Sequence, residues 1–166
     1  MSKARGGLQT FIDLDLPDLR TLDRALRREA LEEVTAAPDI TSAIAILEQC
    51  MGFYGTELTS IAKQTPIGTM NILRDKLEHI VEKRPDARER YVNFALDTLH
   101  NPFEVWSTPY DDDMQRFIYI GAYDCRQQML VVVAPWDDRV LWNFMHSEAK
   151  KLNRHRQGEL LYKRYP

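Results

Sequence analysis

Four short segments between residues 103 and 145 constrain the fold of this chain most strongly. Each is rich in β-branched and aromatic residues with a period of two, which is typical of a β-strand. The loops between them carry Pro and Asp residues and are short enough for hairpins. One segment, Met129–Val133, is apolar on both faces, as a central strand is when both sides of its sheet are covered. The pattern therefore predicts a four-stranded antiparallel meander made from residues 103–108, 115–122, 128–134 and 139–145.

Two helical patterns precede the meander. A stripe of apolar residues predicts a helix over residues 72–84, which ends before Pro85. The sequence at residues 86–89 has the form of a capping box and predicts a second helix from residue 87 to residue 99. A last strand is expected near Leu160–Tyr162. The predicted fold class is α+β, with helices followed by a four- or five-stranded antiparallel sheet.

The first third of the chain is predicted to be a helical extension. Leucines recur at steps of three to five residues and predict an amphipathic helix over residues 17–35, and Asp39 is placed to cap a second helix. The Pro and Gly in residues 65–69 indicate a linker. These features divide the chain into a helical N-terminal region, residues 1–65, and a second domain, residues 66–166, which is expected to fold by itself.

Composition excludes several classes of protein. With 44% hydrophobic and 28% charged residues, the chain has the composition of a globular protein. No window approaches 18 consecutive apolar residues, so no membrane association is expected and a cytoplasmic location is predicted. Cys50 and Cys125 belong to no C-x-x-C pair, and the four histidines lack metal-ligand spacing. Neither a metal nor a cofactor is expected.

Charge is distributed unevenly along the chain. The net charge of −3 argues against a protein that coats nucleic acid through a basic domain. The stretch from His146 to Pro166, however, carries six basic residues against two acidic ones. A phosphate-binding surface, where one exists, is therefore expected to be local and to lie in the C-terminal part.

Five short motifs in succession resemble a known family. They are, in order, Lys76 to Arg84, Arg88 to Tyr91, Asn101 to Trp106, Arg116 to Ile120 and Arg156 to Tyr162. Together they resemble the phage-borne barnase, EndoU, colicin and RelE-like nuclease domains, which are often found at the C-terminus of phage head-morphogenesis proteins. The resemblance covers about residues 66–166. It implies a nuclease-type domain with RNA as its partner.

His79 is the first candidate catalytic residue. It lies two residues from Leu77 and is therefore off the apolar stripe of its helix, on an accessible face. The unperturbed pKa of histidine is the closest to neutrality among side chains, as acid–base cleavage of RNA requires. The resemblance implies that His79 is the catalytic histidine, and the alternative is a solvated surface histidine.

Arg116 is the second candidate catalytic residue. It lies on a predicted strand, and its face depends on packing that the sequence does not fix. The resemblance implies that it points into the site, where a planar guanidinium could stabilise the negative charge of the transition state. An outward-facing strand arginine is the alternative.

The remaining candidates come from the second helix and from the tail. Arg88 and Tyr91 lie in the predicted first helical turn, where backbone amides favour anions, and are predicted to bind substrate. Ordinary surface residues beside a capping box are the alternative. Lys150 is predicted to contact phosphate, although a solvated basic helix would also explain it. Arg156 and Tyr162 match the closing motif of the family, and the resemblance makes them catalytic candidates.

These observations predict a metal-independent endoribonuclease that cleaves RNA by attack of the 2′-hydroxyl group. Such a protein would act as a phage-encoded, toxin-like factor, with a phage structural or immunity-type protein as a further partner. The alternatives are a non-catalytic phage head or packaging accessory and a protein-interaction module, both on a nuclease-like scaffold.

Overall fold

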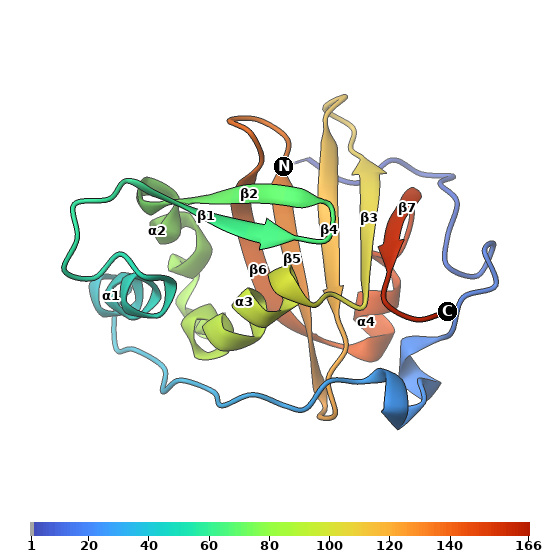
Figure 1. Ribbon diagram of the computed structural model, residues 1–166, viewed down its shortest axis with the longest axis horizontal. Helices are drawn as coiled ribbons and strands as arrows, with labels where there is room; N and C mark the ends of the chain where they lie inside the picture. The colour runs from blue at the N-terminus through green and yellow to red at the C-terminus, as the bar shows by residue number, and fades with distance from the viewer. Residues whose placement is uncertain (1) are drawn as a thin grey trace.

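A seven-stranded sheet forms the centre of the computed structural model, which describes residues 2–166 (Figure 1). The strand order is β1-β2-β6-β5-β4-β3-β7, and every neighbouring pair is antiparallel except β2 and β6, which are parallel. The strands are β1 Ser60–Thr65, β2 Gly68–Leu73, β3 Glu104–Pro109, β4 Gln115–Gly121, β5 Gln127–Ala134, β6 Val140–Glu148 and β7 Glu159–Lys163. The α-helices are α1 Ile40–Met51, α2 Leu77–Val81, α3 Val92–His100 and α4 Ala149–Asn153.

The α+β class and the central meander agree with the sequence prediction. Strands β3 to β6 are the four predicted strands, and β7 is the predicted last strand, paired with β3. The sheet is larger than predicted because β1 and β2 extend it beyond β6, where β2 and β6 meet in parallel at Asn71 and Val140. The prediction of a four- or five-stranded, wholly antiparallel sheet is therefore only partly correct.

The expected linker at residues 65–69 is the turn of the β1–β2 hairpin. Thr65 pairs with Gly68, and the Thr65 hydroxyl donates to the Gly68 carbonyl oxygen at 2.7 Å. Gly68 has a φ of 114°, which only glycine adopts without strain. The same residues that favour a linker also favour a tight turn, so the boundary predicted between residues 65 and 66 falls inside a hairpin.

The helix predicted over residues 17–35 is wrong. Within residues 2–39 the structure contains only two short 3-10 turns, Leu19–Thr21 and Arg24–Leu26, and no α-helix. The carboxylates of Asp18 and Asp23 each accept a hydrogen bond from the backbone amide two residues later, which closes a turn in place of a helix. The predicted cap at Asp39 is confirmed, because its carboxylate accepts from the Ser42 amide at 2.8 Å and α1 begins at the next residue.

The predicted capping box does not form either. Glu89 is fully buried, and its carboxylate binds the guanidinium of Arg84 at 2.6 Å and the amide of Ala37 at 2.9 Å. Glu89 therefore connects the N-terminal segment, through Ala37, to the turns that precede α3. A 3-10 turn at Arg88–Tyr91 comes first, and α3 begins at Val92 instead of at residue 87.

The two faces of the sheet bury separate hydrophobic clusters. On the helical face, Val105, Tyr119, Val131 and Phe144 pack with residues of α1, α2 and α3. The opposite face, here called the N-terminal face, carries residues such as Trp106, Ile118, Leu130 and Val132. It packs against Phe11, Leu19 and Leu22 of the N-terminal segment and Leu152 of α4. Strand β5 is thus covered on both sides, as its sequence predicts.

The N-terminal segment, residues 2–39, follows the rim of the sheet from the β3–β4 turn to α1 (Figure 1). Isolated bridges fix its course at Ala4 with Tyr110, Thr10 with Gln157 and Arg28 with Tyr123. None of the helices among residues 2–166 has both the length and the apolar character needed to cross a membrane.

Candidate active site

A cavity of about 450 Å³ opens on the N-terminal face, beside the part that the N-terminal segment and α4 cover. Its floor is apolar and consists of Leu130 and Val132 of β5 with Trp142 and Met145 of β6. Its polar walls come from several separate segments of the chain. The lining polar side chains are Ser2, His79, Glu82, Lys83, Arg88, Tyr110, Arg116, Asn143 and His155.

His79 lines this cavity from α2. The neighbouring residues Leu77 and Ile80 are buried, whereas the His79 side chain is 42% exposed, in agreement with its predicted position off the apolar stripe. Its ring lies 4.8 Å from the ring of Trp142. Its Nδ1 lies 3.4 Å from Glu82 Oε1, which can form an ion pair with a protonated imidazole. Glu82 occupies the Nδ1 side, so Nε2 is the nitrogen left for a ligand.

Arg116 lines the cavity from β4, and the structure shows which face of the sheet it occupies. It pairs with Thr108 and shares the phase of Ile118, which places it on the N-terminal face. The residue is 6% exposed. Its guanidinium lies 4.8 Å from the Tyr110 ring and 5.0 Å from the Trp136 ring. Packing between two rings fixes the plane of the guanidinium at the cavity.

Asp112 holds the guanidinium of Arg116 from the β3–β4 turn. Its Oδ2 accepts from Arg116 Nη2 at 2.8 Å and from the Ser2 hydroxyl at 2.9 Å. The hydrogen bond from Ser2 lowers the pKa of the Asp112 carboxyl, and those from the Met114 amide and Arg116 lower it further. The start of the N-terminal segment therefore helps to position a cavity residue that is distant in sequence.

Arg88 reaches the cavity from the 3-10 turn before α3. The residue is 8% exposed, and its Nη1 donates to Asn143 Oδ1 of β6 at 2.7 Å. Its Nη2 lies 3.3 Å from a carboxylate oxygen of Asp86. Its Nε is buried and has no hydrogen-bond partner among the described residues. An unsatisfied donor on a buried cation is costly to the folded state.

His155 lines the same cavity and follows α4. Burial lowers the pKa of its imidazole, and the charge of Arg154 lowers it further, so the neutral form is favoured at neutral pH. In the sequence, His155 belongs to the basic stretch from His146 to Pro166 and is not among the predicted site residues. Its role could not be singled out there, because no pattern shows that the end of α4 meets α2 across a cavity.

The predicted residues Arg156 and Tyr162 do not line this cavity. Arg156 is completely buried, and its guanidinium forms two hydrogen bonds with the Glu104 carboxylate, at 2.6 and 2.7 Å. Another hydrogen bond joins it to the Pro17 carbonyl oxygen at 2.8 Å. Tyr162 pairs with Val105 and packs with the helical-face cluster, on the other side of the sheet from Arg116.

Tyr91 and Lys150 also lie outside the cavity. Tyr91 is buried in the helical-face cluster, where its ring lies 4.2 Å from that of His146 and burial raises the pKa of its hydroxyl. Lys150 is exposed on α4 and lines a separate pocket. Of the seven predicted site residues, the structure brings His79, Arg88 and Arg116 together.

The cavity has the chemistry of an anion site. Lys83, Arg88 and Arg116 contribute positive charge, whereas Glu82 is the acidic residue among its lining side chains. Two histidines, His79 and His155, and two aromatic rings, Tyr110 and Trp142, also line it. Within residues 2–166, no three His, Cys, Asp or Glu side chains lie close enough together to hold a metal ion.

Comparison with known proteins gives one match. A family model described as phage-Barnase-EndoU-ColicinE5/D-RelE like nuclease 2 matches residues 54–163, about two thirds of the chain. The match begins before β1, so it includes the β1–β2 hairpin, and it contains every residue of the cavity lining except Ser2. No curated protein and no solved structure matches the chain.

Proposed function

Because the chain belongs to the phage-Barnase-EndoU-ColicinE5/D-RelE like nuclease 2 family, we propose that it is a metal-independent endoribonuclease whose active site is the cavity on the N-terminal face. One observation carries this proposal. His79, Arg88, Arg116 and His155 come from four separate segments of the matched range, and all four side chains line one cavity. Two proton-transfer groups and two fixed cations are the set that such cleavage needs.

The proposed reaction transfers the phosphate within the RNA. The 2′-hydroxyl oxygen forms a bond to the adjacent phosphorus, and the bond from phosphorus to the 5′-oxygen breaks. His155, which burial keeps neutral, accepts the proton of the 2′-hydroxyl. His79, whose Nδ1 lies 3.4 Å from Glu82 Oε1, donates a proton to the departing 5′-oxygen. The products are a 2′,3′-cyclic phosphate and a 5′-hydroxyl group.

Arg88 and Arg116 are proposed to stabilise the charge that develops on the phosphate. The planar Arg116 side chain is fixed between Tyr110 and Trp136, and Arg88 is fixed by Asn143. Neither group has to reorganise during the reaction, which makes its charge more effective than that of a mobile side chain. The apolar floor and the Trp142 ring leave room for a nucleobase next to the reacting phosphate.

Cleavage of RNA in EDTA tests this proposal. We expect the purified protein to produce fragments that end in 2′,3′-cyclic phosphate. The variant His79→Ala is expected to cleave roughly 10²–10⁴-fold more slowly. It should remain folded, because 42% of the His79 side chain is exposed. His100→Ala is a matched control, since His100 is also exposed and lies outside the cavity. RNA that stays intact with the wild-type protein would instead favour a non-catalytic scaffold.

A further inference from the structure

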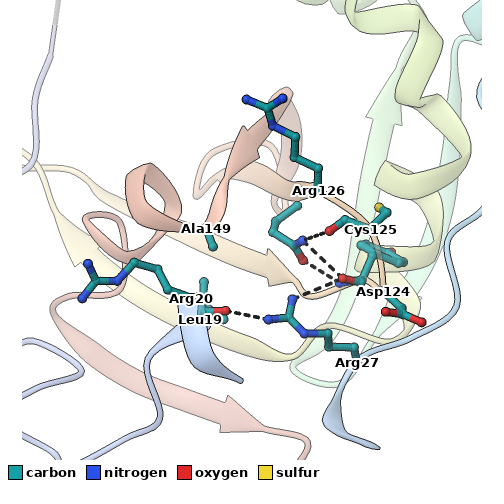
Figure 2. Close-up of a pocket in the computed structure, with 9 residues that line it drawn as sticks. Leu19, Arg20, Arg27, Asp124, Cys125, Arg126 and Ala149 are labelled. Atoms are coloured by element: carbon teal, nitrogen blue, oxygen red, sulfur yellow. Dashed lines mark hydrogen bonds between the residues drawn. The ribbon is translucent and has the colours of Figure 1, made fainter. Parts of the chain in front are cut away.

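Two pockets flank helix α4, on the same side of the sheet as the cavity. One, of about 310 Å³, lies beside the β4–β5 turn and is lined by Arg20, Arg27 and Arg126 (Figure 2). The other, also of about 310 Å³, is lined by Lys150 and Arg154 and again by Arg20. Because Ala149 lines the first pocket and Lys150 the second, the two lie on either side of one helix. We call the five basic residues Arg20, Arg27, Arg126, Lys150 and Arg154 the α4 basic surface.

The charge of the α4 basic surface contrasts with that of the whole chain. Two acidic residues, Asp18 and Asp124, line the same pockets, so the five basic side chains leave a local excess of positive charge on a protein of net charge −3. Arg156 also lines the second pocket, but its charge is compensated by the buried carboxylate of Glu104. A local positive surface on an acidic protein attracts a polyanion to one place.

Several of these cations have no carboxylate partner. Arg27 donates to the backbone carbonyl oxygens of Leu19 at 2.8 Å and of Leu22 and Tyr123 at 3.3 Å, and Figure 2 shows it reaching toward Leu19. Among the described residues, neither Lys150 nor Arg154 has a carboxylate within 4.0 Å. Their charge is therefore available to a ligand.

The other two cations form exchangeable pairs. Arg20 pairs with Asp18 at 2.8 Å and Arg126 with Glu148 at 2.7 Å, and both arginines are largely exposed. In Figure 2 their side chains extend from opposite sides of Ala149. Exposed ion pairs contribute little to stability, so a phosphate group can replace the carboxylate at small cost.

The α4 basic surface begins at the wall of the active-site cavity. His155 lines the cavity, and the residue before it, Arg154, lines the second pocket together with Lys150. An RNA strand that leaves the cavity past His155 therefore contacts Arg154 and Lys150 first, then Arg20, and then the pocket at the β4–β5 turn. Arg20 lines both pockets and joins them, whereas the cavity and the second pocket are connected through the adjacent residues His155 and Arg154.

We infer that the α4 basic surface binds the sugar-phosphate backbone of the single-stranded RNA whose reacting nucleotide occupies the cavity. The inference rests on the proposed ribonuclease function and adds to it that the substrate is a strand of several nucleotides. Contacts to phosphates carry no base specificity, so this surface would raise affinity for any sequence. It explains why a chain of acidic composition concentrates five basic residues, three of them without a carboxylate partner, around one short helix.

Binding and cleavage measured separately test this inference. We would measure the affinity of the full chain for 2′-O-methyl RNA of mixed sequence, which cannot be cleaved because its 2′-hydroxyl is blocked, at several salt concentrations. Arg126→Gln and Lys150→Gln are each expected to weaken binding of long strands and to reduce the slope of log K against log salt by about 0.7, the value for one phosphate contact to a single strand. Binding of a dinucleotide should be unchanged.

Lys63→Gln is the matched control, because it removes the same charge from β1 and Lys63 lines neither the cavity nor the two pockets. If Arg126→Gln and Lys150→Gln alter the affinity and the slope no more than Lys63→Gln does, the inference is wrong. Cleavage of an unmodified dinucleotide separates the two proposals. If the wild-type protein cleaves it and the salt slopes do not change, only the extended surface is refuted. If no RNA of any length is cleaved, the proposed function fails.

Discussion

Two buried arginines of the N-terminal face, Arg88 and Arg156, show how the surroundings of a residue decide its role. All three nitrogens of the Arg156 guanidinium donate to Glu104, Asn153 or the Pro17 carbonyl group, and the residue is completely buried, so it is not accessible to a substrate. Arg88, in contrast, lines the cavity, and its buried Nε has no hydrogen-bond partner among the described residues. The sequence motifs contain both arginines and cannot separate them, because their difference depends on which carboxylates the fold brings near.

The role of Arg156 predicts a large effect on stability. Arg156→Ala is expected to destabilise the protein by about 3–5 kcal/mol, because it leaves the Glu104 carboxylate buried without a cation. The free energy of unfolding in denaturant measures this. Arg20→Ala, which breaks an exposed pair, is the control and should destabilise the protein far less. An equal loss of unfolding free energy for the two substitutions would show that the buried Arg156–Glu104 pair does not stabilise the fold.

The role of Arg116 predicts an effect on the rate instead. Arg116→Lys keeps the charge but loses the planar group between Tyr110 and Trp136, so cleavage of RNA should slow by about 10²–10³-fold. The rate of cyclic-phosphate formation measures this. Arg139→Lys is a matched control, because Arg139 also covers an aromatic ring, that of Phe117, but lies outside the cavity. A variant Arg116→Lys with the wild-type rate would exclude Arg116 from the site.

At the scale of single elements, the sequence predicts the strands of the meander better than the elements of the N-terminal segment. Strands β3 to β6 were predictable because their period of two is long enough to be distinct and turn residues separate them. The N-terminal leucines have a helix-like spacing, but Leu19 and Leu22 are buried against the sheet from short turns that nearby aspartates stabilise. The spacing of apolar residues is the same for a helix and for these packed turns, so tertiary packing decides which of the two forms.

The turn before β7 gives a prediction at the same scale. Gly158 has a φ of 104°, and a Cβ there would overlap the carbonyl oxygen of Ser107 in β3. Gly158→Ala should therefore cost at least about 1–3 kcal/mol and disturb the pairing of β7 with β3. Gly55→Ala is the matched control, because Gly55 also has a positive φ, of 73°, but open space around it. A thermal melt should show a clearly lower Tm for Gly158→Ala than for Gly55→Ala.

At the scale of the whole molecule, the N-terminal segment is a layer of the fold and not an added domain. Phe11, Leu19 and Leu22 cover the N-terminal face, and Arg28 pairs with Asp97 of α3 at 2.8 Å. The sequence could not reveal this because the leucine spacing of the segment is the same as that of an amphipathic helix. Its contacts are with residues about a hundred positions away, as between Arg28 and Tyr123.

Deletion of the N-terminal segment tests this view of the molecule. A chain without residues 2–37 keeps α1 and the whole range that the family model matches, yet it exposes Trp106 and Ile118 on the N-terminal face. Loss of three buried side chains, at about 1.5–3 kcal/mol each, approaches the total stability of about 5–15 kcal/mol that a domain has. We expect the shortened chain to lose cooperative unfolding or to show a much lower Tm.

A shorter deletion serves as the control. Removing only residues 2–6 breaks the contacts of Ser2 and Arg5 with the aspartates of the β3–β4 turn, and those contacts are exposed. Stability should change little, but the rate of RNA cleavage should fall, because Ser2 holds the Asp112 carboxylate that orients Arg116.

A chain without residues 2–37 that unfolds as cooperatively as the full protein would show that the N-terminal segment is dispensable. Cooperative unfolding should then also be measured for the domain predicted from the sequence, residues 66–166. This domain begins inside the β1–β2 turn and lacks β1.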